Sequence, residues 1–418
     1  MTSADLPASP FAFAAWRAFF VARVTATLAQ MMMVIVIGWQ VYDIARLTMP
    51  VREAAFLLGM VGLAQFLPIV GLTLLVGTLV DRFDRRWIAR IALGVELLCA
   101  GLLAWLALAP VPAIWPLFLV AALLGAARAF AAPALTALAP NLVPAAVLPT
   151  AIAWSSIGFQ GGAILGPLAG GLLYDRFAAA PHAVAGGLLV VGLLALFRIG
   201  PVPRAEAGRA GVAEGLRYVR GNPIVLGAIS LDLAAVVLAG ATAMLPIYAR
   251  DILEVGSDGL GLMRAAPAIG AAGVALMLAH KPLRSGVGRK MFASVGVFAG
   301  ATIVFGLAES LAVAVAALGV LGAADMVSVY VRASLIQLHT PDQMRGRVSA
   351  VSLVFISASN ELGEFRAGTM AAAIGAVQAT VIGGGLALLV TLLWARLFPA
   401  LWRADRLDIP DELKQQPA

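Results

Sequence analysis

Long runs of apolar residues, separated by short polar turns, recur along the whole chain. An α-helix needs about 20 residues to cross the roughly 30 Å hydrocarbon core of a bilayer, and each run is about that long. The pattern therefore predicts an all-α membrane protein with twelve transmembrane helices. The predicted spans are residues 15–41, 54–80, 87–109, 113–137, 147–173, 182–200, 224–248, 259–280, 289–309, 311–337, 348–374 and 376–400.

The longest polar stretch between spans, residues 201–223, divides the chain into two halves of six spans. The halves echo each other weakly, because Arg289 and Lys290 follow the eighth span as Arg85 and Arg86 follow the second. We therefore expect two pseudo-symmetric six-helix bundles with a site between them near the midplane. The predicted organisation is residues 1–200 for the first bundle, 201–223 for a cytoplasmic linker, 224–400 for the second bundle and 401–418 for a cytoplasmic tail.

Composition excludes several other classes of protein. The chain is 61% hydrophobic and 12% charged with a mean hydropathy of +0.96, too little polar surface for a soluble protein. The net charge of +7 is scattered through short loops, so we expect no nucleic-acid partner. One cysteine and three distant histidines predict neither a disulfide nor a metal site, and no ATP-binding or hydrolase motif is present. We expect no cofactor and no enzyme activity.

Basic residues predict the orientation, since cytoplasmic loops are enriched in Lys and Arg. Both termini are expected in the cytoplasm. With this orientation the inner loops carry Arg82, Arg85, Arg86, Arg204, Arg209, Arg217, Arg220, Lys281, Arg284, Arg345 and Arg347, and the outer loops carry Arg46, Arg52, Arg176 and Arg250.

Two motifs carry a resemblance to a known family. The loop Gly77-Thr-Leu-Val-Asp81-Arg82-Phe-Asp84-Arg85-Arg86 is similar to the motif Gly-x-Leu-Ala-Asp-Arg-x-Gly-Arg-Lys of the major facilitator superfamily, with Asp84 in place of a glycine that Asp can replace because it tolerates positive φ. The fifth predicted span contains the antiporter motif Gly-x-x-x-Gly-Pro-x-x-Gly-Gly. Its fixed positions are Gly162, Gly166, Pro167, Gly170 and Gly171.

The resemblance implies a transporter of a bacterial-type inner membrane. In the family the loop motif controls the change between inward and outward states, which would give Gly77, Asp81, Arg82 and Arg85 a gating role. The antiporter motif is associated with exporters, although close packing of small residues alone would also explain it. The strings Trp39-Gln-Val-Tyr-Asp43, Gly215-Leu-Arg-Tyr-Val-Arg220, Arg345-Gly-Arg347 and Asn360-Glu-Leu-Gly-Glu364 resemble the branch containing the enterobactin exporter and related secretion proteins.

Charged residues inside predicted spans are candidates for function, because they are costly in hydrocarbon. Spans one, four, seven and ten line the central cavity in the resembled fold, and they carry Arg23, Arg128, Asp232 and Asp325. We expect these four residues to contact substrate. The alternatives are a structural ion pair for Arg128 and a headgroup contact for Arg23.

Acids within spans are candidates for proton coupling, because burial of a carboxylate favours its protonated form. The candidates are Asp232, Asp325, Glu361 and Glu364, the last two sharing a helix face by their spacing of three. Arg332 lies two helical turns after Asp325 and could hold an acid ionised. Structural pairing and substrate contact are the alternative roles. Glu96 in the third span has no assigned role.

These observations predict a secondary active exporter that moves a small organic solute, siderophore-like or drug-like, by proton-coupled antiport and alternating access. Its expected partners are the solute, protons and membrane lipids, and we expect a monomer. The alternatives are a lipid or lysolipid flippase on the same fold, or a transport-inactive membrane sensor or scaffold.

Overall fold

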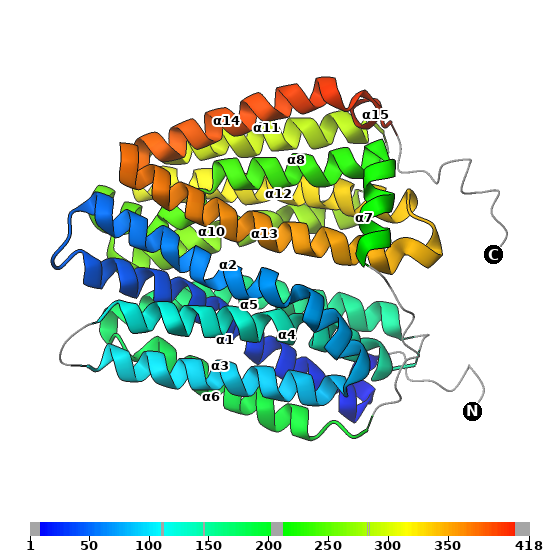
Figure 1. Ribbon diagram of the computed structural model, residues 1–418, viewed down its shortest axis with the longest axis horizontal. Helices are drawn as coiled ribbons and strands as arrows, with labels where there is room; N and C mark the ends of the chain where they lie inside the picture. Colours follow the sequence, from blue (N-terminus) through cyan, green and yellow to red (C-terminus); the bar gives the residue numbers. More distant parts are fainter. Residues whose placement is uncertain are drawn as a thin grey trace. The chain divides into compact units, whose positions relative to one another are not determined.

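The computed structural model describes residues 9–109, 113–144, 147–201, 212–281, 283 and 285–405, with some side chains, including those of residues 73–82, outside the described set. The described part is helical and contains no strand (Figure 1). Its α-helices are α1 Ala14–Ala45, α2 Val51–Arg82, α3 Arg85–Ala107, α4 Trp115–Leu138, α5 Leu148–Arg176, α6 Ala180–Phe197, α7 Val212–Gly221, α8 Pro223–Ala239, α9 Leu245–Ile247, α10 Gly256–His280, α11 Val287–Gly306, α12 Leu311–Leu338, α13 Asp342–Ile374, α14 Ala376–Leu397 and α15 Pro399–Trp402.

The long helices confirm the prediction of an all-α membrane protein. Within the described residues, eleven segments are long and apolar enough to cross a membrane. The remaining predicted span lies in α13, which has 33 residues but carries Glu361, Glu364 and Arg366. These charges lower its hydropathy, so its length rather than its composition marks it as a span.

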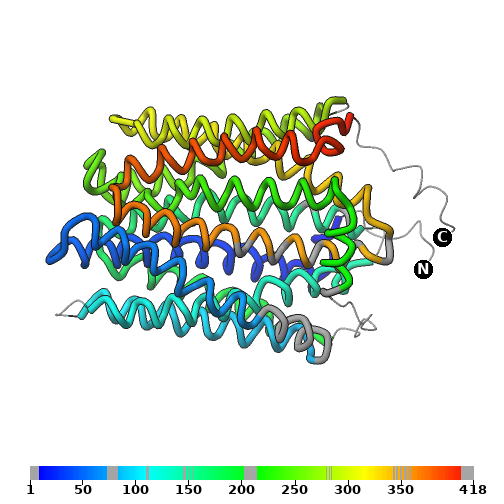
Figure 2. The backbone as a smooth tube through the Cα atoms, turned by 45° about the horizontal axis from the view of Figure 1, so that its top comes forward, coloured from blue at the N-terminus to red at the C-terminus, as the bar shows by residue number. Residues whose placement is uncertain are grey.

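The chain forms two compact units, whose segments can be followed by residue number along the coloured tube of Figure 2. Unit 1 comprises Met1–Thr48, Ala64–Ala207 and Gly256–Ala265, and unit 2 comprises Met49–Leu63, Gly208–Val255 and Ala266–Ala418. Helices α2 and α10 therefore each contribute one end to unit 1 and the other to unit 2. The domain boundaries expected from the sequence stay a prediction.

Helix packing repeats from one unit to the other. In unit 1, α1 packs on α5 and α6, and α3 packs on α4 and α6. In unit 2, α8 packs on α13 and α14, and α11 packs on α12 and α14. The second pattern is the first shifted by six spans, as expected for two pseudo-symmetric bundles.

Local sequence explains where several helices begin and end. Asn222 caps α8, because its side-chain oxygen accepts hydrogen bonds from the backbone N–H groups of Ile224 and Val225, both at 3.1 Å. The helix ends at Gly240, whose φ of +33° lies in the left-handed region that favours glycine. The chain then continues through a 3₁₀ turn, Ala241–Met244, so the seventh span is interrupted.

The polar segment between the bundles contains a helix that the sequence analysis did not predict. The described part of this segment forms α7, which packs on α13. Arg347 forms an ion pair with Glu214, and the Tyr218 hydroxyl donates a hydrogen bond to the carbonyl of His339. These contacts hold α7 against α13 and the end of α12 within unit 2.

Candidate functional site

A buried ion pair joins α8 and α12 in unit 2. The Arg332 guanidinium contacts the Asp232 carboxylate, and both residues are at most 6% exposed. The sequence suggested that Arg332 holds an acid ionised, and the acid that it contacts is Asp232 on the neighbouring helix. Removing only one partner of such a pair is strongly destabilising, because a buried charge is then left uncompensated.

A second carboxylate lies beside this ion pair. Asp232, Asp325 and Ser328 line one small cavity, with room for about one water molecule. Among the described residues, Asp325 has no ion-pair partner. The Ser328 hydroxyl is buried and has no hydrogen-bond partner there. If both acids are ionised, the two carboxylates and one guanidinium leave this cluster with a charge of −1.

Three charged residues in the second half of α13, Glu361, Glu364 and Arg366, have different surroundings. Glu361 is 9% exposed, whereas Glu364 is half-buried with its side chain close to Gly62 of α2. Arg366 lies between Gly240 and Gly383, where a Cβ on either glycine would come within about 3 Å of the guanidinium. Neither its Nε nor its Nη2 has a hydrogen-bond partner in the described part of the chain.

Arg128 of unit 1 is held by a neutral amide. Its Nη1 donates a 3.0 Å hydrogen bond to Oε1 of Gln65 on α2. Gly125, one turn before Arg128, makes this contact possible, because a side chain there would collide with the backbone of Gln65. The guanidinium therefore stays within the bundle, and its predicted role as a substrate contact remains a prediction.

Glu96 is fully buried in unit 1. Its Oε1 accepts a 2.5 Å hydrogen bond from Nε2 of Gln30 on α1, and its Oε2 has no partner in the described residues. Glu96 also lies close enough to Arg128 for an electrostatic interaction. The acid without an assigned role thus belongs to a polar network that joins α1, α2, α3 and α4.

Arg23 does not extend away from its bundle. The centre of its guanidinium lies 6.0 Å from the centroid of the Phe159 ring on α5, and its Nε is buried without a described partner. A cation near an aromatic face is attracted to the ring's π electrons. This placement leaves substrate contact by Arg23 as a prediction.

The glycines of the antiporter motif contact two different helices. Gly162, Gly166 and Gly170 face α1, where a Cβ added to them would meet Thr27, Met31 and Met32, respectively. Gly171 faces the first turn of α10, close to Ser257 and Gly261. Pro167 lies between these contacts, and its carbonyl also faces Gly261. The motif is therefore a packing device within unit 1, where spacing by four residues places three glycines along one seam.

Part of the predicted gating loop lies outside the described side chains, namely those of Gly77, Asp81 and Arg82. The Arg85 Nη1 donates a 3.1 Å hydrogen bond to the carbonyl of Ala137 near the end of α4. Arg86 and Arg90 each donate to the carbonyl of Ile199 after α6, both at 3.2 Å. Cations are favourable at helix C-termini, so these arginines fasten α3 to α4 and α6.

Asp84 has a different role from the one its position in the motif suggests. Its φ is −64°, so the expectation that it replaces a glycine at positive φ is wrong. Asp84 instead caps α3, accepting a 2.9 Å hydrogen bond from the Arg86 backbone N–H and forming an ion pair with the Arg86 side chain at 2.5 Å. The side-chain hydrogen bond from Arg86 lowers the pKa of the Asp84 carboxyl below its usual range.

Sequence reasoning missed the polar but uncharged members of these clusters, Gln30, Gln65 and Ser328. The sequence feature that could have identified them is an amide or hydroxyl side chain within a long apolar run. Each is less costly in a membrane than a charge and was therefore overlooked, although each lies beside a charged residue.

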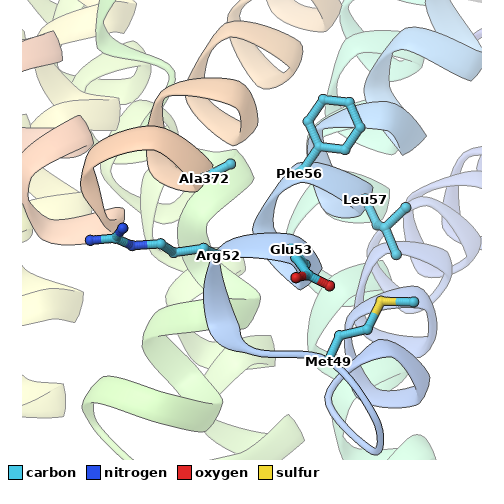
Figure 3. A pocket seen from close by; sticks show the side chains of 6 residues that line it. All are labelled: Met49, Arg52, Glu53, Phe56, Leu57 and Ala372. Carbon is cyan, nitrogen blue, oxygen red and sulfur yellow. The ribbon is translucent and has the colours of Figure 1, made fainter.

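A pocket larger than the cavity beside Asp325 lies elsewhere in unit 2, at the start of α2 (Figure 3). It has a volume of about 370 Å³ and is lined by Met49, Arg52, Glu53, Phe56, Leu57 and Ala372. Only Ala372 comes from the facing helix, α13. None of the charged residues predicted from the sequence as substrate or proton sites lines it.

Comparisons with known proteins agree with this architecture. A sequence model of the Major Facilitator Superfamily matches residues 19–364. The chain is 27% identical over 392 residues to "Enterobactin exporter EntS" of Escherichia coli O1:K1 / APEC, a match that covers 91% of each chain. The protein of the same name from Shigella boydii serotype 18 has the same identity and coverage.

Solved structures show the same fold. The crystal structure of a D-xylose-proton symporter superposes with a TM-score of 0.71 at 18% identity, covering 92% of this chain and 98% of that one. The POT family transporter PepTSo gives a TM-score of 0.74 at 12% identity, covering 93% and 98%. At these identities the similarity establishes the fold alone.

Proposed function

We propose that this protein, which belongs to the Major Facilitator Superfamily of membrane transporters, is a secondary active exporter that exchanges protons for a small organic solute. The observation that carries the proposal is the charge imbalance in unit 2. The buried Arg332 forms an ion pair with Asp232, and a second acid, Asp325, shares with Asp232 a cavity the size of about one water molecule.

The ion pair distinguishes the two acids. Asp232 is stabilised in its ionised form by direct contact with Arg332. Asp325 lacks such a partner among the described residues, so a proton is the simplest means of neutralising it. We therefore assign the exchangeable proton to Asp325 and a structural role to Asp232.

Protonation of Asp325 would couple to transport through the difference between conformational states. A ligand shifts a conformational equilibrium only by its difference in affinity for the two states. Asp325 would drive the change if its cavity is wetter in one state than in the other. Glu361 and Glu364 on α13 are further candidates for the proton site, because both are acids at least partly buried within unit 2.

The export direction rests on two lines of support. The antiporter motif fits at every fixed position, from Gly162 to Gly171. The relatives at 27% identity are exporters by name. A siderophore-like or drug-like solute is therefore the first substrate class to test, with Arg128 and Arg23 as candidate contacts.

Transport in proteoliposomes tests the proposal directly. Enterobactin and ethidium would serve as probes, with and without an imposed pH gradient. We expect D325N to abolish the stimulation by the gradient while probe binding persists, and E361Q and E364Q report whether the α13 acids share the role. The double variant D232N/R332Q is the matched control, because it removes two charges from the same cluster without leaving either unpaired.

The outcomes separate the competing functions. Full gradient-driven transport by D325N would overturn the assignment of the proton site. Movement of lysolipid without any dependence on the gradient would instead identify a flippase. Absence of transport of every probe, with conformational change intact, would favour a sensor or scaffold.

A further inference from the structure

Helices α2 and α13 cross at a contact between two glycines within unit 2. A Cβ added to Gly59 would lie 2.9 Å from the Cα of Gly368, so at this point the backbones touch. The pocket of Figure 3 begins beyond this crossing, toward the start of α2. Arg52 is seven residues from Gly59, or about 10 Å along the helix axis. The pocket is therefore a wedge between two helices that separate from a common crossing.

The lining of the wedge changes from charged to apolar along α2. Arg52 and Glu53 are exposed in the first turn, and within the described chain neither forms a hydrogen bond or an ion pair. Phe56, one turn further into the span, is 42% exposed, and Leu57 follows it. This order matches the boundary of a membrane, where headgroups meet the first methylene groups of the acyl chains.

We propose that the wedge binds a zwitterionic phospholipid whose headgroup carries a primary ammonium, as in phosphatidylethanolamine. Arg52 would donate hydrogen bonds to the phosphate, and Glu53 would accept them from the ammonium. Phe56 and Leu57 would contact the beginning of an acyl chain. Figure 3 shows the Arg52 and Glu53 side chains directed apart, as separated phosphate and ammonium groups require.

Charge complementarity selects this lipid over the alternatives. A phosphatidylglycerol headgroup offers no cation, so Glu53 would face a second negative group without compensation. A choline headgroup is zwitterionic, but its trimethylated nitrogen cannot donate a hydrogen bond to Glu53. The apolar floor formed by Phe56 favours a lipid over a free zwitterion of the same charge.

Lipid-dependent unfolding tests the proposal on the full-length protein in detergent, without substrate and without a pH gradient. The probes are phosphatidylethanolamine, phosphatidylcholine and phosphatidylglycerol with identical acyl chains, and free glycerophosphoethanolamine. The variants are R52Q and E53Q. The control variants are D175N and R176Q, since Asp175 and Arg176 form another adjacent pair of exposed acid and base at a helix end.

We expect phosphatidylethanolamine to raise the unfolding temperature of the wild type and of both controls. Loss of one charged hydrogen bond should weaken its apparent affinity about tenfold in R52Q and in E53Q. Equal stabilisation by phosphatidylglycerol or phosphatidylcholine would overturn the proposal, as would unchanged affinity in E53Q or equal binding of glycerophosphoethanolamine. Because the readout is binding, it does not depend on whether transport is coupled to protons.

Discussion

The two units share a pattern of helix packing but neutralise their buried charges differently. In unit 1 two charged side chains within spans form hydrogen bonds with amides, Glu96 with Gln30 and Arg128 with Gln65. In unit 2 Asp232 is met by the opposite charge of Arg332. An amide can hydrogen-bond to an acid in either protonation state, whereas an ion pair favours one state. The repeated fold therefore supports two electrostatic designs.

This contrast suggests a division of labour between the units. In the transport mechanism proposed above, Arg128 would exchange its hydrogen bond to the neutral Gln65 for a contact with the solute. The ion pair of unit 2 favours the ionised form of Asp232, and for this reason we propose Asp325 as the first candidate for the exchangeable proton.

Breaking the ion pair of unit 2 should have the largest effect. R332Q leaves the Asp232 carboxylate buried without its cation, and we expect a loss of about 3–5 kcal/mol in the free energy of unfolding. Thermal unfolding of the purified protein measures it. The double variant D232N/R332Q should recover most of this loss, because no charge is left uncompensated. A loss in the double variant equal to that in R332Q would show that the pair itself is not the cause.

Filling the glycine seam of unit 1 should have an intermediate effect. G166V places a Cβ 2.7 Å from that of Met31 and 3.0 Å from the carbonyl oxygen of Leu28, so α1 and α5 must separate. We expect a loss of about 1–3 kcal/mol from overpacking. The matched control is G161V on the same helix, where an added Cβ meets nothing within 4 Å.

The glycine seam is also a difference in helix packing between the two units. Unit 1 places three glycines against α1, whereas at the corresponding contact in unit 2 Gly363 of α13 faces the carbonyl of Val236 on α8. Equal unfolding temperatures for G166V and G161V would mean that the antiporter motif does not act through this packing.

Removing single amides from unit 1 should have the smallest effect. Q30L leaves the fully buried Oε1 of Glu96 without its hydrogen bond, at an expected cost of about 1.5 kcal/mol. Q65L should cost less, about 1 kcal/mol, since Arg128 is only half-buried and has further interactions. Unfolding by heat, compared between the two variants, checks the order. A larger loss for Q65L would mean that Arg128 depends on its amide more than Glu96 does.

The amino-acid sequence was enough to predict the class of protein, its membrane-spanning helices and its family. Apolar runs of the length of a bilayer admit few structures other than helices, because backbone groups in hydrocarbon must be hydrogen-bonded within their own segment. The antiporter motif was also readable from sequence, since small residues at intervals of four fall along one helix face. Because charged residues are rare inside membrane spans, the sequence also marked Asp232, Asp325 and Arg332 as candidate functional residues.

Which of these groups contact one another depends on how the helices pack in space. Asp325 and Arg332 lie two turns apart on one helix, but Arg332 contacts Asp232 on α8. The reason is that the neighbours of a side chain on other helices depend on helix rotation and crossing angle, which sequence spacing does not give. The amides Gln30 and Gln65 likewise gained meaning only from the acid and the guanidinium that face them. Helix formation is a local property of the chain, whereas the pairing of buried charges is a property of the packed bundle, and sequence spacing constrains only the first.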